Sequence, residues 1–342
     1  MVTWQYRDAL GAATDLIPLF HSVLANCKVQ AGEKVMIYGD HHSPPHYAAA
    51  FVAAAQQLGA DVFQILIPTQ QPDILAGPVW DAWHSVDMVV DLESITTSVY
   101  RPLRMSAIAA GTRVLRVTEP EDVLFRMPPD PLVRARAKRA EALVDRADTF
   151  HITSPAGTDI TVDVVGRQPH GLWGITEEPG SWDHWPVGLV VVGANQAGTN
   201  GKIIVDVGDI LLSMQHYVNT PITITVEEGI ITDIEGKLDA HLLRQWFESW
   251  SDPRAYHISH VGWGCDHRAI WDRLARKVPG GTCDAESFYG VMQIAFGRDT
   301  SPYIGGQNDV PAHIDFDCLN NSISLDGAQV LEHGNFVLDE LK

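Results

Sequence analysis

Cysteine is scarce in this chain, and its few cysteines lie far apart. Among 342 residues there are four, at Cys27, Cys265, Cys283 and Cys318, and no two of them form a C-x-x-C pair. This spacing argues against a zinc site built from thiolates and against a framework of disulfides. Free cysteines of this kind fit a reducing compartment, so we expect a cytoplasmic protein.

Long apolar runs are also missing. No stretch of about 18 apolar residues, the length that a membrane-spanning helix needs, occurs anywhere in the chain. The N-terminal sequence MVTWQYRDAL lacks the basic region followed by an apolar region that marks a signal peptide. We therefore expect a protein that neither crosses a membrane nor is exported.

Basic residues are few relative to acidic ones. Lys and Arg total 24 against 43 Asp and Glu, which gives a formal net charge of -19. Phosphate backbones repel such a chain, so we expect no nucleic-acid partner. Histidine, in contrast, is abundant, with 15 in the chain and most of them in its second half. Because histidine is the commonest metal ligand and the usual base near neutral pH, this composition permits a metal enzyme.

The first part of the sequence predicts an α/β domain with a parallel sheet, which we place at residues 1–148. Residues 32–68 have the pattern of a strand, a turn, an alanine-rich helix ended by Gly59, and a second strand. Such a unit closes with a right-handed crossover between parallel strands. Its turn, GDHHSPPH, contains no G-x-G-x-x-G, so a dinucleotide site has no support there.

From residue 149 the sequence pattern changes to short segments of alternating apolar and polar residues, which predict strands, separated by turns rich in Gly, Asn and Asp. This pattern is typical of hairpins in a mostly antiparallel α+β domain, which we place at residues 149–342. Two helices are predicted within it, over residues 238–250 and 266–278.

A possible metal-binding pair stands near the C-terminus, in the stretch VPAHIDFD. In a strand, residues two apart point to the same face, so His313 and Asp315 could bind one metal ion together. The alternative is a solvated strand end, since both residue types are common at the surface.

The order of motifs in the second half resembles the thermophilic metalloaminopeptidases of the aminopeptidase T type. The motifs are HVGWG, then ESFYGVMQIAFG, then HIDFD, and they follow a turn that contains Trp185 and Pro186. The resemblance implies an aminopeptidase T-like fold, with a metal-binding C-terminal domain. In those peptidases a two-metal site takes ligands from a glutamate before a G-x-G turn, a glutamate and a histidine around an H-x-A-L-G stretch, and the final H-x-D.

This chain departs from the peptidase pattern at two positions. His260 stands in place of the glutamate before the G-x-G turn, and Gln293 stands in place of the histidine of the H-x-A-L-G stretch. Glu286 occupies the other glutamate position, and His313 and Asp315 keep the H-x-D. Two metal ions about 3.5–4 Å apart need bridging carboxylates, so these changes remove support for the second ion.

The remaining set, His260, His313 and Asp315, has the composition of the facial site of non-haem Fe(II) oxygenases. With the length and domain order, it resembles the 2,5-dihydroxypyridine 5,6-dioxygenases, which are ring-cleaving enzymes of nicotinate degradation. The resemblance implies an extradiol-like enzyme with Fe(II) as cofactor and a small aromatic substrate and O2 as partners. It also implies N-formylmaleamate as product, with both oxygen atoms inserted, and a homo-oligomeric assembly.

The same resemblance indicates further site residues. His184, in a turn near the peptidase active site, is the candidate base for the substrate hydroxyl, and His216 and Tyr217 are additional pocket candidates. Glu286 either hydrogen-bonds a ligating histidine or remains a metal ligand. Apart from the resemblance, Arg104, in SVYRPLRMS, could reach from the first domain and neutralise an anionic substrate oxygen, because pockets at domain interfaces are common. The alternative for each is a purely structural role.

Three other functions stay open on the sequence alone. One is a metallo-aminopeptidase-like hydrolase with a modified metal site, which predicts two zinc or cobalt ions. Another is a binding protein that has kept the fold without catalysis. The third is ring cleavage of another aromatic diol or a trihydroxypyridine, because pocket shape rather than the metal ligands selects the substrate.

Overall fold

The computed structural model describes residues 9–69, 74–94, 101–276, 282–301 and 304–342. The chain divides into two compact units. The first comprises Met1–Pro129 and Trp173–Pro186, and the second comprises Asp130–Leu172 and Val187–Lys342.

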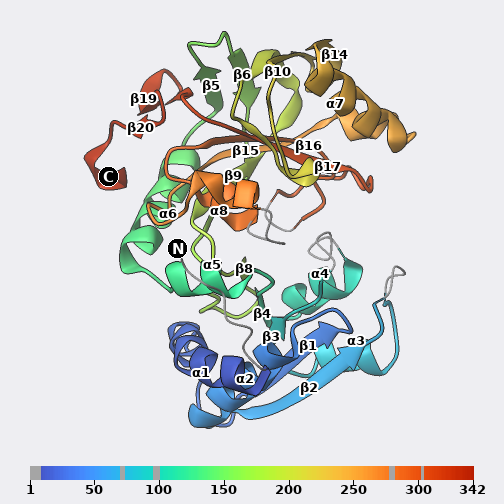
Figure 1. Ribbon diagram of the computed structural model, residues 1–342, viewed down its shortest axis with the longest axis vertical. Coiled ribbons are helices and arrows are strands. Elements are labelled where there is room, and N and C mark those ends of the chain that lie inside the picture. The colour runs from blue at the N-terminus through green and yellow to red at the C-terminus, as the bar shows by residue number, and fades with distance from the viewer. Residues whose placement is uncertain (1–8, 70–73, 95–100, 277–281, 302–303) are drawn as a thin grey trace. The chain divides into compact units, whose positions relative to one another are not determined.

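The first unit contains a parallel sheet with the strand order β2-β1-β3-β4-β8 (Figure 1). Every neighbouring pair in it is parallel. The predicted strand, helix and strand over residues 32–68 are confirmed as β1, α2 and β2. The strands are β1 (Lys34–Asp40), β2 (Asp61–Ile67), β3 (Met88–Asp91), β4 (Arg113–Arg116) and β8 (Trp182–His184), and the helices are α1 (Ala9–Asn26), α2 (Pro45–Gln57), α3 (Pro78–Trp83), α4 (Pro102–Ala109) and α5 (Glu121–Arg126).

The second unit contains two antiparallel sheets, as the alternating pattern predicts. The larger has the order β14-β13-β10-β6-β5-β18-β19-β20 and the smaller β12-β11-β17-β16-β15-β9-β7 (Figure 1). Strands of the larger sheet are β5 (Thr149–Thr153), β6 (Asp159–Asp163), β10 (Asn195–Val205), β13 (Ile222–Glu227), β14 (Ile230–Gly236), β18 (Ser322–Leu325), β19 (Ala328–Glu332) and β20 (Asn335–Phe336). Those of the smaller sheet are β7 (His170–Leu172), β9 (Leu189–Gly193), β11 (Ile210–Leu211), β12 (His216–Tyr217), β15 (Ile258–Gly264), β16 (Met292–Gly297) and β17 (His313–Cys318).

Helix α6 (Pro131–Val144) lies in the second unit, whereas the predicted boundary at residue 148 would place it in the first domain. Its buried residues include Val133, Ala137, Ala140 and Val144, which form one apolar stripe. That stripe packs on β7 and β9. An apolar stripe predicts that a helix packs against another element, but it does not predict which sheet the helix packs against.

Two further helices were predicted in the second unit. The first is confirmed as α7 (Leu238–Ser249). The second, predicted over residues 266–278, is confirmed only over Trp271–Arg276, which form a 3-10 helix, while residues 277 and 278 lie outside the described residues. Asp266 accepts a hydrogen bond from the backbone N–H of Arg268, and Asp284 accepts one from that of Ile270. These side chains satisfy backbone donors without a regular α-helix.

The core of the second unit lies between its two sheets. One apolar cluster joins Phe150 and Ile160 of the larger sheet to Ile294 and Phe316 of the smaller one. This packing leaves the opposite face of the smaller sheet available for polar side chains.

Candidate metal centre

Strand β17 carries two kinds of side chain on its two faces. Ile314, Phe316 and Cys318 belong to the apolar core of the second unit. Since successive side chains in a strand alternate, His313 and Asp315 point to the other face together. Their Nε2 and Oδ2 atoms are 3.3 Å apart, so the two residues meet as their spacing predicts.

His260 reaches the same face through an irregularity in β15. Pairing with β16 passes from Ile258 opposite Phe296 to Val261 opposite Ile294, so two residues, Ser259 and His260, face one on the partner strand. This is a β-bulge, which re-aims a side chain.

The residue opposite the bulge is small. Ala295 is fully buried, and on the other side of β16 it pairs directly with Asp315. Directly paired residues point to the same face, so only a methyl group stands between His260 and Asp315. The imidazole of His260 can therefore extend across β16.

The three side chains converge on one point. The Nε2 atom of His260 lies 3.1 Å from Oδ1 of Asp315. The two imidazole rings are stacked, with centroids 5.4 Å apart and an interplanar angle of 22°. One ligand atom from each residue can be chosen so that all three lie within 4.8 Å of one another. His260 and Asp315 are buried, at 6% and 5% exposure.

The far nitrogen of each ring is also occupied. Nδ1 of His313 donates to the backbone carbonyl of Arg298 at 2.9 Å, and Nδ1 of His260 lies 3.3 Å from the hydroxyl of Ser259. A carbonyl only accepts, so Nδ1 of His313 carries its hydrogen, and Nε2 is the atom that faces Asp315. Such anchoring of the far nitrogen is typical of metal-ligating histidines.

The charges at this centre favour a cation. Burial raises the pKa of Asp315, but the two histidines outweigh burial and hold that pKa well below its usual range. Burial lowers the pKa of His313, but Asp315 outweighs burial and the net pKa is raised. Ligands of this type exchange protons for metal when they bind one. Two imidazole nitrogens and one carboxylate therefore fit a divalent transition metal.

Comparison with known proteins identifies the family. The chain matches the 2,5-dihydroxypyridine 5,6-dioxygenase family over residues 15–338. The chain belongs to this family. It is 32% identical over 344 residues to the 2,5-dihydroxypyridine 5,6-dioxygenase of Pseudomonas putida KT2440, and the match covers 95% of this chain and 97% of that protein.

Solved structures agree with this assignment to the dihydroxypyridine dioxygenase family. The structure of 2,5-dihydroxypyridine dioxygenase from Pseudomonas putida KT2440 matches with a TM-score of 0.90 at 31% identity, covering 96% of this chain and 99% of that one. AmpT from Thermus thermophilus matches with a TM-score of 0.60 at 13% identity, covering 95% and 99%, which shows the fold alone. The predicted dioxygenase family and aminopeptidase T-like fold are thus confirmed. No helix in the described residues has the length and apolar character needed to cross a membrane.

In this dioxygenase family member, sequence reasoning missed three residues around the metal centre. They are Ser259 and Ala295, at the bulge, and Asp317, which is fully buried two positions after Asp315. Burial raises the pKa of Asp317 well above its usual range, and the charge of Asp315 adds to this. The period of two along HIDFD could have flagged Asp317, but no local signal marks the other two.

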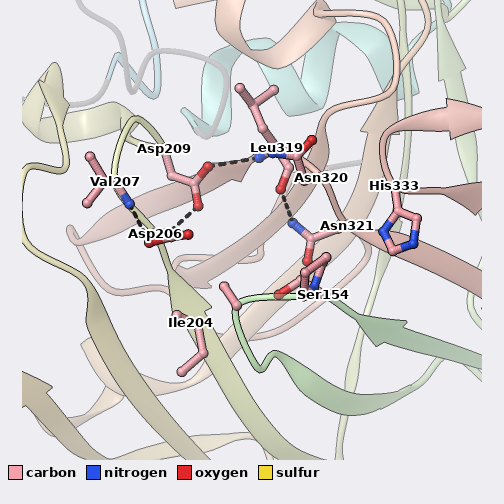
Figure 2. A pocket seen from close by; sticks show the side chains of 11 residues that line it. Ser154, Ile204, Asp206, Val207, Asp209, Leu319, Asn320, Asn321 and His333 are labelled. Atoms are coloured by element: carbon pink, nitrogen blue, oxygen red, sulfur yellow. Dashed lines mark hydrogen bonds between the residues drawn. The ribbon is translucent and has the colours of Figure 1, made fainter.

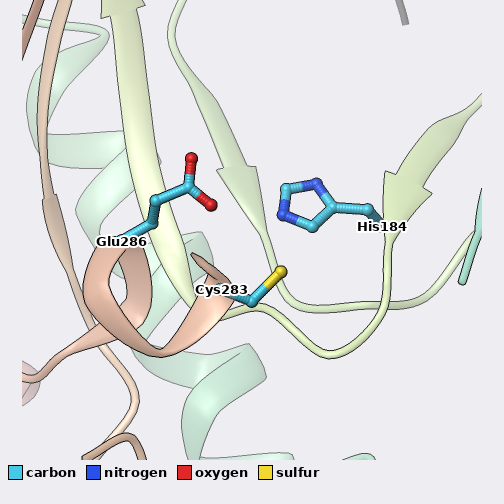
Figure 3. A group of neighbouring side chains, drawn as sticks. All are labelled: His184, Cys283 and Glu286. Atoms are coloured by element: carbon cyan, nitrogen blue, oxygen red, sulfur yellow. The ribbon is translucent and has the colours of Figure 1, made fainter. Parts of the chain in front are cut away.

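Glu286 and His184 lie in different units. Glu286 lies on α8 (Thr282–Ser287) of the second unit, one turn after Cys283, as Figure 3 shows. His184 is the last residue of β8 in the first unit, paired with Arg116 of β4. Burial lowers the pKa of His184 to about 3, and Arg116 adds to this. His184 is therefore neutral at pH 7, the form that accepts a proton, although a pKa nearer 7 would make a stronger base.

The other predicted residues have structural partners. Nε2 of His216 lies 2.8 Å from Oδ1 of Asp239 on α7, and the hydroxyl of Tyr217 donates to the carbonyl of Trp271. Arg104 is buried at 2% exposure, with its guanidinium on Asp91 and 3.3 Å from Glu93. These acidic partners already neutralise Arg104 within the first unit, so the arrangement does not support a role on substrate.

A pocket of about 210 Å³ lies beyond the C-terminal end of β17 in the second unit (Figure 2). Asp209 lines it, and burial raises the pKa of this carboxyl to about 6. The backbone N–H groups of Asp206 and Leu319 donate to its two oxygens. Among the described residues that line this pocket, none belongs to the predicted site, so the pocket is a separate feature.

Proposed function

We propose that this chain is a non-haem Fe(II) dioxygenase that opens the ring of 2,5-dihydroxypyridine to N-formylmaleamate. The observation that carries the proposal is the convergence of two imidazole Nε2 atoms and one carboxylate on one face of a sheet. Family membership supports the substrate, because the family and its Pseudomonas relative are named for it.

His260, His313 and Asp315 would hold the iron. When bound, the metal supplies Lewis acidity and the redox chemistry that couples an electron-rich ring to dioxygen. The protein's own part is to position these three side chains by the alternation of β17 and the bulge of β15. Burial of His260 and Asp315 excludes water from the ligands and strengthens the electrostatic attraction for a cation.

Two further roles belong to this proposal. His184, neutral at pH 7, accepts the proton of the ring hydroxyl. Glu286 is the second residue; a hydrogen bond from a ligating histidine would need a free ring nitrogen, whereas Nδ1 of His260 and Nδ1 of His313 already face Ser259 and Arg298, so a place as metal ligand is the remaining expectation for it. Neither role is needed for metal binding by the three ligands. Replacing His184 should therefore lower turnover without changing the iron content.

We also propose a cytoplasmic location and a homo-oligomeric assembly. All four cysteines are free and buried, which suits a reducing compartment. The net charge of -19 disfavours nucleic acid, so a small aromatic substrate and O2 remain the expected partners.

The test is anaerobic loading of the purified protein with Fe(II), followed by oxygen uptake on addition of 2,5-dihydroxypyridine. We expect one iron per chain and one O2 consumed per substrate, with both lost in His313→Ala. His241→Ala is the matched control, because His241 is an exposed histidine on α7 of the same unit.

Two outcomes would redirect the proposal. Two zinc ions per chain with release of amino acids from peptides would return the chain to hydrolase chemistry. Iron binding without oxygen uptake on 2,5-dihydroxypyridine would point to another aromatic diol or a trihydroxypyridine.

A further inference from the structure

We propose that Ser259 is a positioning residue that fixes the hydrogen of His260 on Nδ1 and thereby presents Nε2 to the metal. The inference deepens the proposed function and rests on it, because it takes His260 and His313 as metal ligands. Ser259 itself does not touch the point where the three ligands converge.

The hydrogen bonds of Ser259 decide the direction of its hydroxyl. Ser259 is fully buried, and its hydroxyl donates to the backbone carbonyl of Arg298 at 2.9 Å. A hydroxyl has one hydrogen and a carbonyl has none to give, so the hydrogen of Ser259 is committed to Arg298. Toward Nδ1 of His260, 3.3 Å away, Ser259 can only accept. A hydrogen on Nδ1 of His260 therefore has an acceptor in Ser259, whereas a hydrogen on Nε2, 3.1 Å from Oδ1 of Asp315, must leave when a metal binds.

The same carbonyl also sets the other histidine. Arg298 accepts from Nδ1 of His313 at 2.9 Å, using the second of its two lone pairs. The backbone N–H of Arg298 donates to the carbonyl of Ala312 at 2.7 Å, which holds Arg298 beside the start of β17. One backbone carbonyl therefore fixes His313 directly and His260 through Ser259.

The bulge in β15 is what makes this contact possible. In a regular strand, Ser259 and His260 would point to opposite faces. Here both residues stand opposite Ala295, and the hydroxyl of Ser259 lies beside the ring of the next residue. The backbone carbonyl of Ser259 still accepts from Ala194 on the β9 side at 3.0 Å, so the bulge is anchored.

Loss of the hydroxyl should therefore act on the metal ligand rather than on the fold. Without an acceptor at Ser259, a hydrogen on Nδ1 of His260 has no partner in this network. The form with its hydrogen on Nε2, where Asp315 accepts it, is then favoured, and that hydrogen competes with the metal. Removing a group that orients a ligating histidine typically costs about 10-fold to 100-fold in metal affinity.

The experiment compares Ser259→Ala, Ser259→Thr and Thr199→Val. Thr keeps a hydroxyl at position 259. Thr199 is a matched control, because it is fully buried in the same unit, donates to the carbonyl of Asn195 at 2.7 Å and accepts from the N–H of Asp163 at 3.2 Å. Two properties are measured: anaerobic Fe(II) affinity by titration, and the imidazole tautomers of the metal-free protein by ¹⁵N NMR.

We expect Ser259→Ala to weaken Fe(II) binding about 10-fold to 100-fold and to remove the hydrogen from Nδ1 of His260 in the metal-free protein, leaving a hydrogen only on Nε2 beside Asp315. His313 should keep its Nδ1 hydrogen, since Arg298 is unchanged. Ser259→Thr should stay within about 3-fold of the unmodified protein, and Thr199→Val should change neither property.

The inference is overturned if Ser259→Ala keeps both the Fe(II) affinity and the Nδ1 hydrogen of His260. Should Ser259→Ala not fold, Ser259→Cys serves instead, because a thiol is a weak acceptor, and unchanged values in both measurements would likewise overturn it. Failure of the proposed function looks different. In that case the unmodified protein would bind no Fe(II) that depends on His313, while the tautomers of the metal-free protein could still be compared.

Discussion

A buried cluster of ionisable side chains in the first unit and another in the second differ in how their charges are balanced. In the first unit, the guanidinium of Arg104 contacts the carboxylates of Asp91 and Glu93, so opposite charges pair with one another. In the second unit, two imidazole nitrogens and the carboxylate of Asp315 point at one another. The lone pairs of these three groups need a proton or a metal ion between them. Burial and charge alone therefore do not mark a site, whereas converging lone pairs do.

The largest effect is expected where the second cluster loses its charge. Asp315→Asn keeps the shape of the side chain but removes the anion that attracts a cation. Oxygen uptake should fall to background and Fe(II) affinity should drop more than about 100-fold, beyond the usual effect of an orienting group. Metal titration and circular dichroism of the metal-free variant check this. A variant that still binds one iron tightly would exclude Asp315 as a ligand.

The opposite result is expected when the first cluster loses its cation. Arg104→Met removes the one cation that contacts both Asp91 and Glu93 and leaves these buried acids with one more distant or single arginine partner each, Arg116 at 3.9 Å and Arg101 at 3.2 Å. Breaking a buried ion pair in this way costs about 3 kcal/mol of unfolding free energy. Fe(II) affinity of the folded protein should stay within about 3-fold, because the ligands lie in the other unit. Urea unfolding and metal titration measure the two quantities. Loss of metal affinity with retained stability would reverse the comparison.

An intermediate effect is expected at the pair of His216 and Asp239. Burial raises the pKa of Asp239, but hydrogen bonds from His216, Thr220 and Asn219 outweigh it and bring the pKa to about 2. A carboxyl with a lowered folded pKa adds stability above its unfolded pKa and loses it as pH falls through the folded value. Asp239→Asn should therefore cost about 2 kcal/mol of unfolding free energy at pH 7.

The pH dependence gives this prediction its control. The difference in unfolding free energy between the unmodified protein and Asp239→Asn should be constant from about pH 7 to pH 5 and narrow below about pH 4. Urea unfolding at four pH values measures it. A difference that does not change with pH would mean that the carboxylate charge contributes nothing at this position.

The smallest effect is expected for an exposed pair. Nη2 of Arg254 lies 2.6 Å from Oδ2 of Asp252, but the side chain of Arg254 is 52% exposed. Solvent and salt screen such a pair, so Arg254→Met should cause no measurable change in the urea midpoint or in Fe(II) affinity. A clear loss of stability in this variant would show that exposure is a poor guide to the weight of an ion pair in this molecule.

Local sequence patterns predicted a substantial part of the molecule. Alternation and turn residues identified the parallel unit around residues 32–68 and the antiparallel strands after residue 149. The H-x-D spacing placed His313 and Asp315 on one face, and the motif order led to the family. These predictions succeed because strand alternation and helix periodicity depend on neighbouring residues only.

Long-range pairing decided the rest. His260 joins the other ligands only because β15 pairs with β16 through a bulge opposite the small Ala295, more than 30 residues along the chain. The packing of α6 on β7 and the neutralisation of Arg104 by Asp91 are of the same kind. The sequence by itself determined the strand that carries two ligands and the family. Tertiary structure alone decided the third ligand's position and the role of Ser259, because strand register is set by contacts between segments and not within them.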